Sequence, residues 1–347
     1  MLVDSPPEQR AETAAAPPTR RAIRAVGLLA SLGLLVLVAL ASIAIGAKAL
    51  PLDQVWHGLF HDSGTYADVV VGDRLSRTVL GLLAGAALGL AGAVLQALTR
   101  NPLADPGLLG INAGASAAVV TAITYFGVTS LSGYVWFAFF GAAAVGALVW
   151  FLGGSRGATP VRLALAGTAI SAALYGYLQA VMITDGAALG KMRFWTVGSL
   201  ASATDTTIKQ VLPFLAVGTL LALALARPLN AVTMGDDTAR ALGANLNRTR
   251  ALSMAAATVL CGAATAACGP IVFVGLMVPH VVRSFTGPDL RWILPYATVL
   301  SPVLLLGADV VGRMVARPAE LQVGIVTAVL GGPVFIHLVR RRRTAQL

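Results

Sequence analysis

Charged residues are scarce in this sequence. Asp, Glu, Lys and Arg make up 12% of its 347 residues, whereas soluble domains carry roughly 25%. Hydrophobic residues make up 57%. This composition excludes an ordinary soluble domain and predicts an all-α, polytopic membrane protein that lies in a lipid bilayer.

Residues that bind metals or form disulfides are also few. The two cysteines, Cys261 and Cys268, lie in one apolar run without a Cys-x-x-Cys motif, so we predict neither a disulfide framework nor a zinc site. His57 and His61 are spaced like neighbours on a helix face, but no third ligand accompanies them. We therefore predict a surface helix there and no metal site.

Acidic residues are too sparse for enzymatic metal chemistry. Asp236, Asp237 and Arg240 loosely resemble the magnesium site of a membrane phosphotransferase, yet no second set of acids accompanies them. The glycines of residues 307–313 are spaced like a phosphate-binding loop, but the Lys-Ser/Thr pair is missing. The sequence thus predicts no enzyme and no cofactor in this chain.

Long apolar runs dominate what is present. With about 20 residues per crossing, we predict ten spans, near residues 25–48, 78–98, 108–126, 134–153, 162–184, 210–227, 251–268, 270–283, 292–312 and 321–339. The first is interpreted as an uncleaved span. The eighth is short and contains Pro279 and His280, so a re-entrant segment is the alternative.

The distribution of basic residues predicts the orientation. The net charge of +10 could suggest nucleic acid, but the basic residues lie at span ends rather than on one face. With ten crossings, roughly two thirds of them fall on the side of both termini, which the positive-inside rule places in the cytoplasm. We predict an N-in, C-in protein of the bacterial cytoplasmic membrane, without a nucleic-acid partner.

The expected organisation has three parts. Residues 1–22, rich in Pro, Ala and charge, are predicted to be a disordered cytoplasmic tail. Residues 23–340 form the transmembrane domain, with a cytoplasmic loop at 230–250, and residues 341–347 form a second cytoplasmic tail.

Residues 235–250 form a long polar stretch between two strongly apolar runs. We expect Asp236 and Asp237 to cap a short helix and Gly243 to end it. A helix of two turns is marginal alone in water because nucleation is costly. We therefore predict that it lies on the surface of another protein.

Several motifs occur in one order along the chain. They are Arg-Leu-Ser-Arg at 74–77, Arg-Asn-Pro-Leu-Ala-Asp-Pro at 100–106, Trp-Thr-Val-Gly-Ser-Leu at 195–200, Phe-Val-Gly-Leu-Met-Val-Pro-His at 273–280, Ala308-Asp309 with Arg313, and Glu-Leu-Gln-Val-Gly-Ile-Val-Thr at 320–327. In these motifs, from about residue 30 onward, the chain resembles the FecCD-type permeases of ABC importers for iron–siderophores, haem and cobalamin. Ser76 departs from the family's usual proline, which leaves the start of the second helix open.

The resemblance implies a type II ABC importer permease with several partners. A second permease, identical or paralogous, would pair with this chain. Two ATPase subunits would hold the ATP and magnesium, and an extracytoplasmic substrate-binding protein would deliver a ferric siderophore or a related chelate. The resemblance does not say which chelate is carried.

The resemblance also implies roles for individual residues. The residues implied to couple the permease to the ATPase are Gly235, Asp236, Asp237, Ala239, Arg240, Ala241, Leu242 and Gly243. Within this set, the docking face consists of Leu242, Gly243, Ala239 and Ala241. Docking of the binding protein falls to Arg74, Arg77 and Arg313. The inner gate and pathway fall to Ser155, Thr159, Trp195 and Gly198.

Three alternatives remain open at this stage. Arg74 and Arg77 could simply extend to the membrane interface, and Arg313 could pair with Asp309 four residues earlier. An ion-coupled secondary transporter is the rival function, with the intramembrane Asp309 as its only evident proton carrier.

Overall fold

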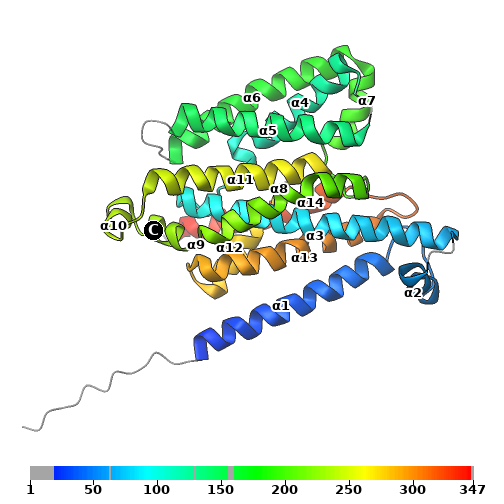
Figure 1. Ribbon diagram of the computed structural model, residues 1–347, viewed down its shortest axis with the longest axis horizontal. Coiled ribbons are helices and arrows are strands. Elements are labelled where there is room, and N and C mark those ends of the chain that lie inside the picture. The colour runs from blue at the N-terminus through cyan, green and yellow to red at the C-terminus, as the bar shows by residue number, and fades with distance from the viewer. Residues whose placement is uncertain (1–18, 62–63, 129, 155–159, 345–347) are drawn as a thin grey trace, which may run out of the picture.

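The computed structural model describes residues 19–61, 64–128, 130–154 and 160–344, and in these ranges it contains helices and no strand (Figure 1). The first eight helices are α1 (Thr19–Ala44), α2 (Leu52–Phe60), α3 (Tyr66–Thr99), η1 (Pro106–Leu109), α4 (Ile111–Phe126), α5 (Leu131–Gly154), α6 (Pro160–Thr184) and α7 (Gly186–Trp195). The others are α8 (Asp205–Ala224), α9 (Ala226–Thr233), α10 (Asp236–Ala241), α11 (Leu246–Cys268), α12 (Val274–Thr286), α13 (Leu290–Val315) and α14 (Val323–Thr344). The all-α prediction is confirmed.

Each of the ten predicted spans coincides with one helix. Seven helices are long and apolar enough to cross a membrane, namely α1, α3, α5, α6, α8, α11 and α13. Helix α4 and the described apolar part of α14 are shorter. Helix α12 has only 13 residues and follows a non-helical stretch at 269–273, so the eighth predicted span contains a short helix that a non-helical segment separates from α11.

Helix α3 is the centre of the bundle and packs against α13, α11 and α12. Its glycines permit this packing: a Cβ at Gly85 would lie 2.6 Å from the Cα of Pro302 in α13, and one at Gly92 would overlap the backbone of Gly275 in α12. In a membrane, such close backbone approach replaces the missing hydrophobic driving force. These glycines therefore serve packing within one chain.

Helix α3 also begins earlier than hydropathy indicates. Thr65 and Asp68 form a capping box at its start, and Ser76 lies ten residues inside it. The predicted span at 78–98 lies within α3, and the start of this helix, which Ser76 left open, is at Tyr66, where α3 packs against α2. Helix α1 likewise begins at Thr19, so residues 19–22 are helical rather than part of a tail.

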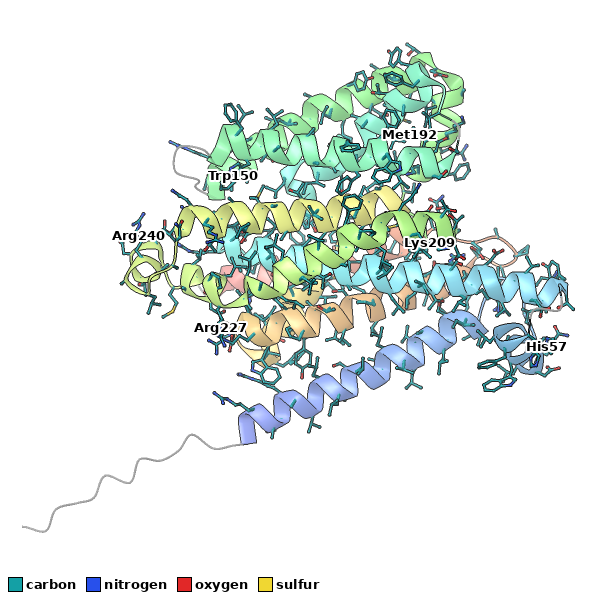
Figure 2. The ribbon with its side chains drawn as sticks, viewed as in Figure 1. His57, Trp150, Met192, Lys209, Arg227 and Arg240 are labelled. Atoms are coloured by element: carbon teal, nitrogen blue, oxygen red, sulfur yellow. The ribbon has the colours of Figure 1, made fainter. Side chains whose placement is uncertain are left out.

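The two ends of the bundle carry different short helices. Helix α10, the start of α1 and the end of α14 lie at one end, here named the α10 end, whereas α2 and α7 lie at the other, the α2 end (Figure 1). Arg227 and Arg240 lie at the α10 end and His57 lies at the α2 end (Figure 2). Both ends of the described chain thus lie on one side, as an even number of crossings requires.

Candidate functional site

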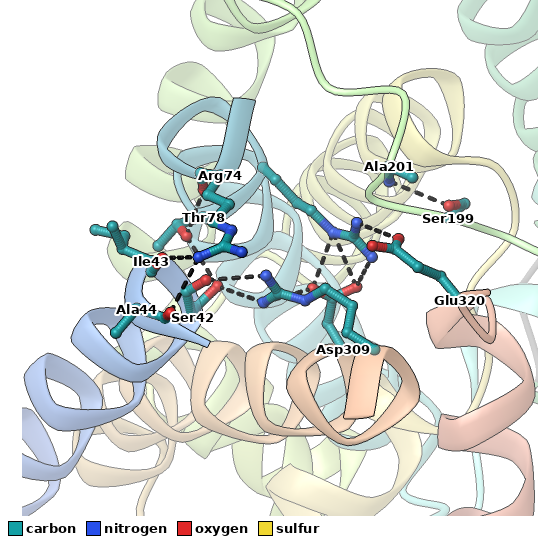
Figure 3. Close-up of polar contacts among 11 residues, drawn as sticks. Ser42, Ile43, Ala44, Arg74, Thr78, Ser199, Ala201, Asp309 and Glu320 are labelled. Atoms are coloured by element: carbon teal, nitrogen blue, oxygen red, sulfur yellow. Dashed lines mark hydrogen bonds and ion pairs between the residues drawn. The ribbon is translucent and has the colours of Figure 1, made fainter. Parts of the chain in front are cut away.

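Three arginines and two acids meet at the α2 end (Figure 3). We name Arg74, Arg77, Arg313, Asp309 and Glu320 the arginine cluster. The Arg77 guanidinium donates to both carboxylate oxygens of Asp309, with Nη2–Oδ1 at 2.7 Å and Nε–Oδ2 at 3.0 Å, and its Nη1 donates to Oε2 of Glu320 at 2.6 Å. Arg313 reaches Oδ2 of Asp309 at 3.1 Å. One buried carboxylate thus holds two arginines from different helices.

The remaining donors of the cluster bind the end of α1. Arg74 donates to the carbonyls of Ile43, Ala44 and Lys48 at 3.1, 3.0 and 2.6 Å. Helix ends expose carbonyls without intrahelical partners, and α1 has no basic residue in its last turn. Arg74 therefore serves as the C-terminal cap of α1.

The arginines are buried. Arg74, Arg77 and Arg313 are 6%, 8% and 1% exposed, and Arg313 also donates to the Ser42 carbonyl at 2.9 Å. The pairing of Arg313 with Asp309, predicted from their i, i+4 spacing, is present. The contacts of Arg77 with Asp309 and Glu320 were not predicted, because no sequence signal joins residues more than 230 positions apart.

The arginine cluster borders a cavity of about 640 Å³, here named the docking cavity. Its lining includes all three arginines, Glu320 and, from other elements, Lys48, Tyr66, Asp73 and the loop residues 201–204. Lys48 is exposed and lies 4.1 Å from the centre of the Tyr66 ring. The structure thus brings the three predicted docking residues together around one opening.

The segment 195–200 is fixed by two neighbouring elements. Ser199 N donates to the Cys268 carbonyl at the end of α11 at 2.7 Å, and Gly324 N at the start of α14 donates to the Gly198 carbonyl at 3.1 Å. Gly198 has φ +80°, and a Cβ there would lie 2.6 Å from the carbonyl oxygen of Pro270. Trp195 and Gly198, the predicted pathway residues, therefore lie where α7, α11 and α14 meet.

At the α10 end, the short helix α10 is held by its own chain. Asp236 pairs with Arg100 and, at 2.7 Å, with Arg250. Ala239 is fully buried against Val232 and Leu246. Much of the surface that α10 needs thus comes from this chain and not from another protein, and Ala239 does not belong to an exposed docking face.

The outer side of α10 is nevertheless exposed. Leu242 is 63% exposed, Ala241 and Gly243 are also exposed, and the space around Gly243 is open. Gly243 has φ +77° and follows the last turn, as predicted for a glycine that ends a helix. The predicted capping by Asp236 and Asp237 is wrong, because Gly235 is the N-cap and both acids lie in the first turn without a capping bond.

Arg100 and Arg250 change the electrostatics of this loop. Burial opposes the ionisation of Asp236, but hydrogen bonds from Arg100 and Arg250 outweigh it and lower the pKa of Asp236. Asp237 is fully exposed and pairs with Arg240 at 2.9 Å. Asp236 is thus structural, whereas Asp237 and Arg240 are accessible.

Comparison with known proteins identifies the chain. The model of the FecCD transport family matches residues 34–341. The chain belongs to the FecCD transport family. It is 46% identical over 326 residues, 93% of this chain and 96% of the relative, to the ferric enterobactin transport system permease protein FepD of Escherichia coli (strain K12). It is 37% identical to the hemin transport system permease protein HmuU of Yersinia pestis, over 89% of this chain and 94% of that relative.

A solved structure agrees in fold with this FecCD permease. An inward-facing conformation of a metal-chelate type ABC transporter has a TM-score of 0.79 and 28% identity, and the match covers 90% of this chain and 98% of that one. The FecCD chain is therefore a multi-pass permease of the inner membrane. Ser155 and Thr159, the predicted inner-gate residues, lie outside the described residues.

Proposed function

We propose that this FecCD permease imports an iron(III) siderophore of the catecholate type, driven by ATP hydrolysis on separate subunits. The observation that carries the proposal is 46% identity to a ferric enterobactin permease along almost the full length of both chains. Relatives that carry hydroxamate or hemin are less similar, at 38% and 37% identity. A secondary transporter is disfavoured, because the carboxylate of Asp309 is engaged in ion pairs with two arginines of the same chain.

The substrate class is tested by uptake in a strain that lacks this permease. We expect restored expression to support accumulation of radioactive iron from ferric enterobactin, and less from ferric hydroxamate or ferric citrate supplied at equal concentration. Equal uptake of all three chelates would contradict the catecholate proposal.

We infer that the exposed side of α10 binds the ATPase, with the α10 end in the cytoplasm. Leu242 and Gly243 supply a small apolar surface, and the ion pairs of Asp236 keep the loop in place behind it. A Gly243→Trp variant should still insert into the membrane and assemble with the ATPase subunits, but ATP hydrolysis by those subunits should no longer drive uptake.

The matched control is Gly127→Trp. Gly127 also has positive φ, +63°, and open space where a Cβ would lie, but it follows α4 at the opposite end. Both variants carry the same kind of backbone strain. Uptake at the wild-type rate in Gly243→Trp, or equal loss in both variants, would contradict the coupling proposal.

We further infer that the docking cavity accepts carboxylates of a substrate-binding protein at the outer face. Arg77 and Arg313 are paired with acids, whereas the hydrogen bonds of Arg74 go to carbonyls, and within the described residues no carboxylate binds it. Lys48 adds an exposed cation. Charges at such a rim orient an acidic partner and accelerate its association.

Lys48→Glu tests this without disturbing the buried arginines. We expect weaker binding of the substrate-binding protein and a slower association rate that depends less on salt. Lys209→Glu is the control, because Lys209 is an exposed basic residue near the start of α8 that does not line the cavity. Equal association rates for the two variants would contradict the docking proposal.

A second permease would complete the pathway. Helix α6 is among the least buried of the long spans, and it exposes Thr168, Gln179 and several alanines. A face with exposed polar and small side chains packs more favourably against a partner helix, or lines a water-filled pathway, than it contacts lipid. Whether the partner is identical is tested by the subunit composition of the complex purified from its host.

A further inference from the structure

A second cavity lies beside the docking cavity at the α2 end. It has a volume of about 420 Å³, and we name it the aromatic cavity. Its lining includes Tyr134 from α5, Lys191, Phe194 and Trp195 from α7, Ser202 and Gln322. None of these residues belongs to the arginine cluster.

The two cavities share a wall. Ala201 and Ser202 line both of them, and Glu320 lines the docking cavity two residues before Gln322 lines the aromatic one. The segment that carries Ala201 and Ser202 is fixed by the bond from Ser199 to Cys268 and by an Ala201 N bond to the Ser199 hydroxyl at 3.1 Å (Figure 3). The two cavities are therefore neighbours on the face where we propose that the substrate-binding protein docks.

The lining combines aromatic rings with positive charge. Tyr134, Phe194 and Trp195 offer ring faces and edges, which favour stacked or edge-on contacts with another ring. Lys191 offers three donors, and Arg193 lies over the Phe194 ring at 5.5 Å from its centre. Asp185 caps α7 and offsets part of the Lys191 charge.

This combination distinguishes between classes of chelate. A catecholate arm is a flat ring that carries negative charge on its oxygens, so it matches both the rings and the lysine. A hydroxamate arm has no ring to stack. The volume lies near the lower end of the range of about 300–1,000 Å³ for small-molecule sites, so the cavity has room for one catecholate arm.

We infer that the aromatic cavity receives one catecholate arm of the incoming iron(III) chelate, with Lys191 as the cation and Phe194 and Trp195 as the stacking rings. This inference rests on the proposed function. Lys191 and Phe194 are then specificity-determining residues at the outer opening of the permease.

The test measures initial uptake of ferric enterobactin by the complete importer in a strain that lacks the native permease. We expect Lys191→Glu to raise the KM of uptake roughly tenfold, since one hydrogen bond to a charged group is lost and repulsion is added. Lys191→Arg should restore most of the affinity. Phe194→Ala should also raise KM, while the maximal rate stays close to that of the wild type.

Lys209→Glu is the matched control, because it reverses an exposed charge at the same end outside both cavities. Equal KM values for Lys191→Glu, Lys209→Glu and the wild type would overturn the inference while leaving the proposed function standing. A lower maximal rate that Lys191→Arg does not restore would indicate a structural role and would also overturn it. A wild-type chain that does not import ferric enterobactin would refute the proposed substrate and the inference together.

Discussion

Removing the carboxylate of Asp309 is expected to destabilise the permease strongly. Asp309 is fully buried and binds Arg77 at 2.7 Å and Arg313 at 3.1 Å. In Asp309→Asn, Arg77 keeps Glu320, but Arg313, only 1% exposed, loses its one acidic partner in the described structure. Breaking a buried ion pair from one side costs about 3–5 kcal/mol, because a charge is left buried without compensation.

The exposed pair of Asp237 and Arg240 provides the control. Asp237 is fully exposed, and a surface pair of this kind contributes little to the free energy of unfolding. Thermal unfolding of the purified permease in detergent, at one scan rate, should show a midpoint lowered by roughly 5 °C or more for Asp309→Asn. Asp237→Asn should show the same unfolding midpoint as the wild type.

A second variant separates lost charge pairing from lost packing. Replacing a buried pair by apolar residues of similar size is often close to neutral, so Asp309→Leu combined with Arg313→Met should be more stable than Asp309→Leu alone. A midpoint for Asp309→Asn equal to that of Asp237→Asn would show that the buried pairing does not stabilise the fold. A lower stability of the Asp309→Leu, Arg313→Met double variant than of Asp309→Leu alone would lead to the same conclusion.

Two further predictions concern packing and pH. Gly92→Val should prevent the recovery of monodisperse protein from detergent, because any Cβ there overlaps the backbone of Gly275. Gly72→Val should be recovered at the wild-type yield, because the space around Gly72 is open. Burial opposes the ionisation of Asp236, but Arg100 and Arg250 lower its pKa in the folded protein. The ionised carboxylate therefore stabilises the α10 loop at every pH above the ordinary carboxyl pKa near 3.8. This stabilisation should be lost as the pH falls through the lower pKa of the folded state. Hydrogen exchange of residues 235–250 should therefore be faster in Asp236→Asn than in the wild type at pH 7, and the two should converge in acid; identical exchange at pH 7 would contradict this.

Hydropathy predicted the bundle because each crossing needs a long apolar run. All ten predicted spans contain a helix, including the short α12. The surface helix expected around His57 and His61 is confirmed as α2, with His61 at its C-cap. Hydropathy did not reveal the first turns of α3, before the span at 78–98, since they are stabilised by the Thr65–Asp68 capping box and by packing against α2.

The sites were predicted only where neighbours in sequence are neighbours in space. The Asp309–Arg313 pair follows from helical spacing, whereas the bonds from Arg77 to Asp309 and from Arg100 to Asp236 join distant parts of the chain. The burial of Ala239 depends on Val232 and Leu246 folding back around α10, which no local pattern reveals. Family resemblance assigned binding-protein docking to Arg74, Arg77 and Arg313, and only the fold places these three side chains around one cavity.

ATP-driven import is tested most directly by transport in the purified assembly. The permease, isolated from its host with its bound subunits and reconstituted into vesicles that contain ATP, should accumulate ferric enterobactin when the substrate-binding protein is supplied outside. We predict uptake that requires ATP and persists in the presence of a protonophore. Uptake by this chain alone, without ATP and abolished by the protonophore, would contradict ATP-driven import and favour a secondary transporter.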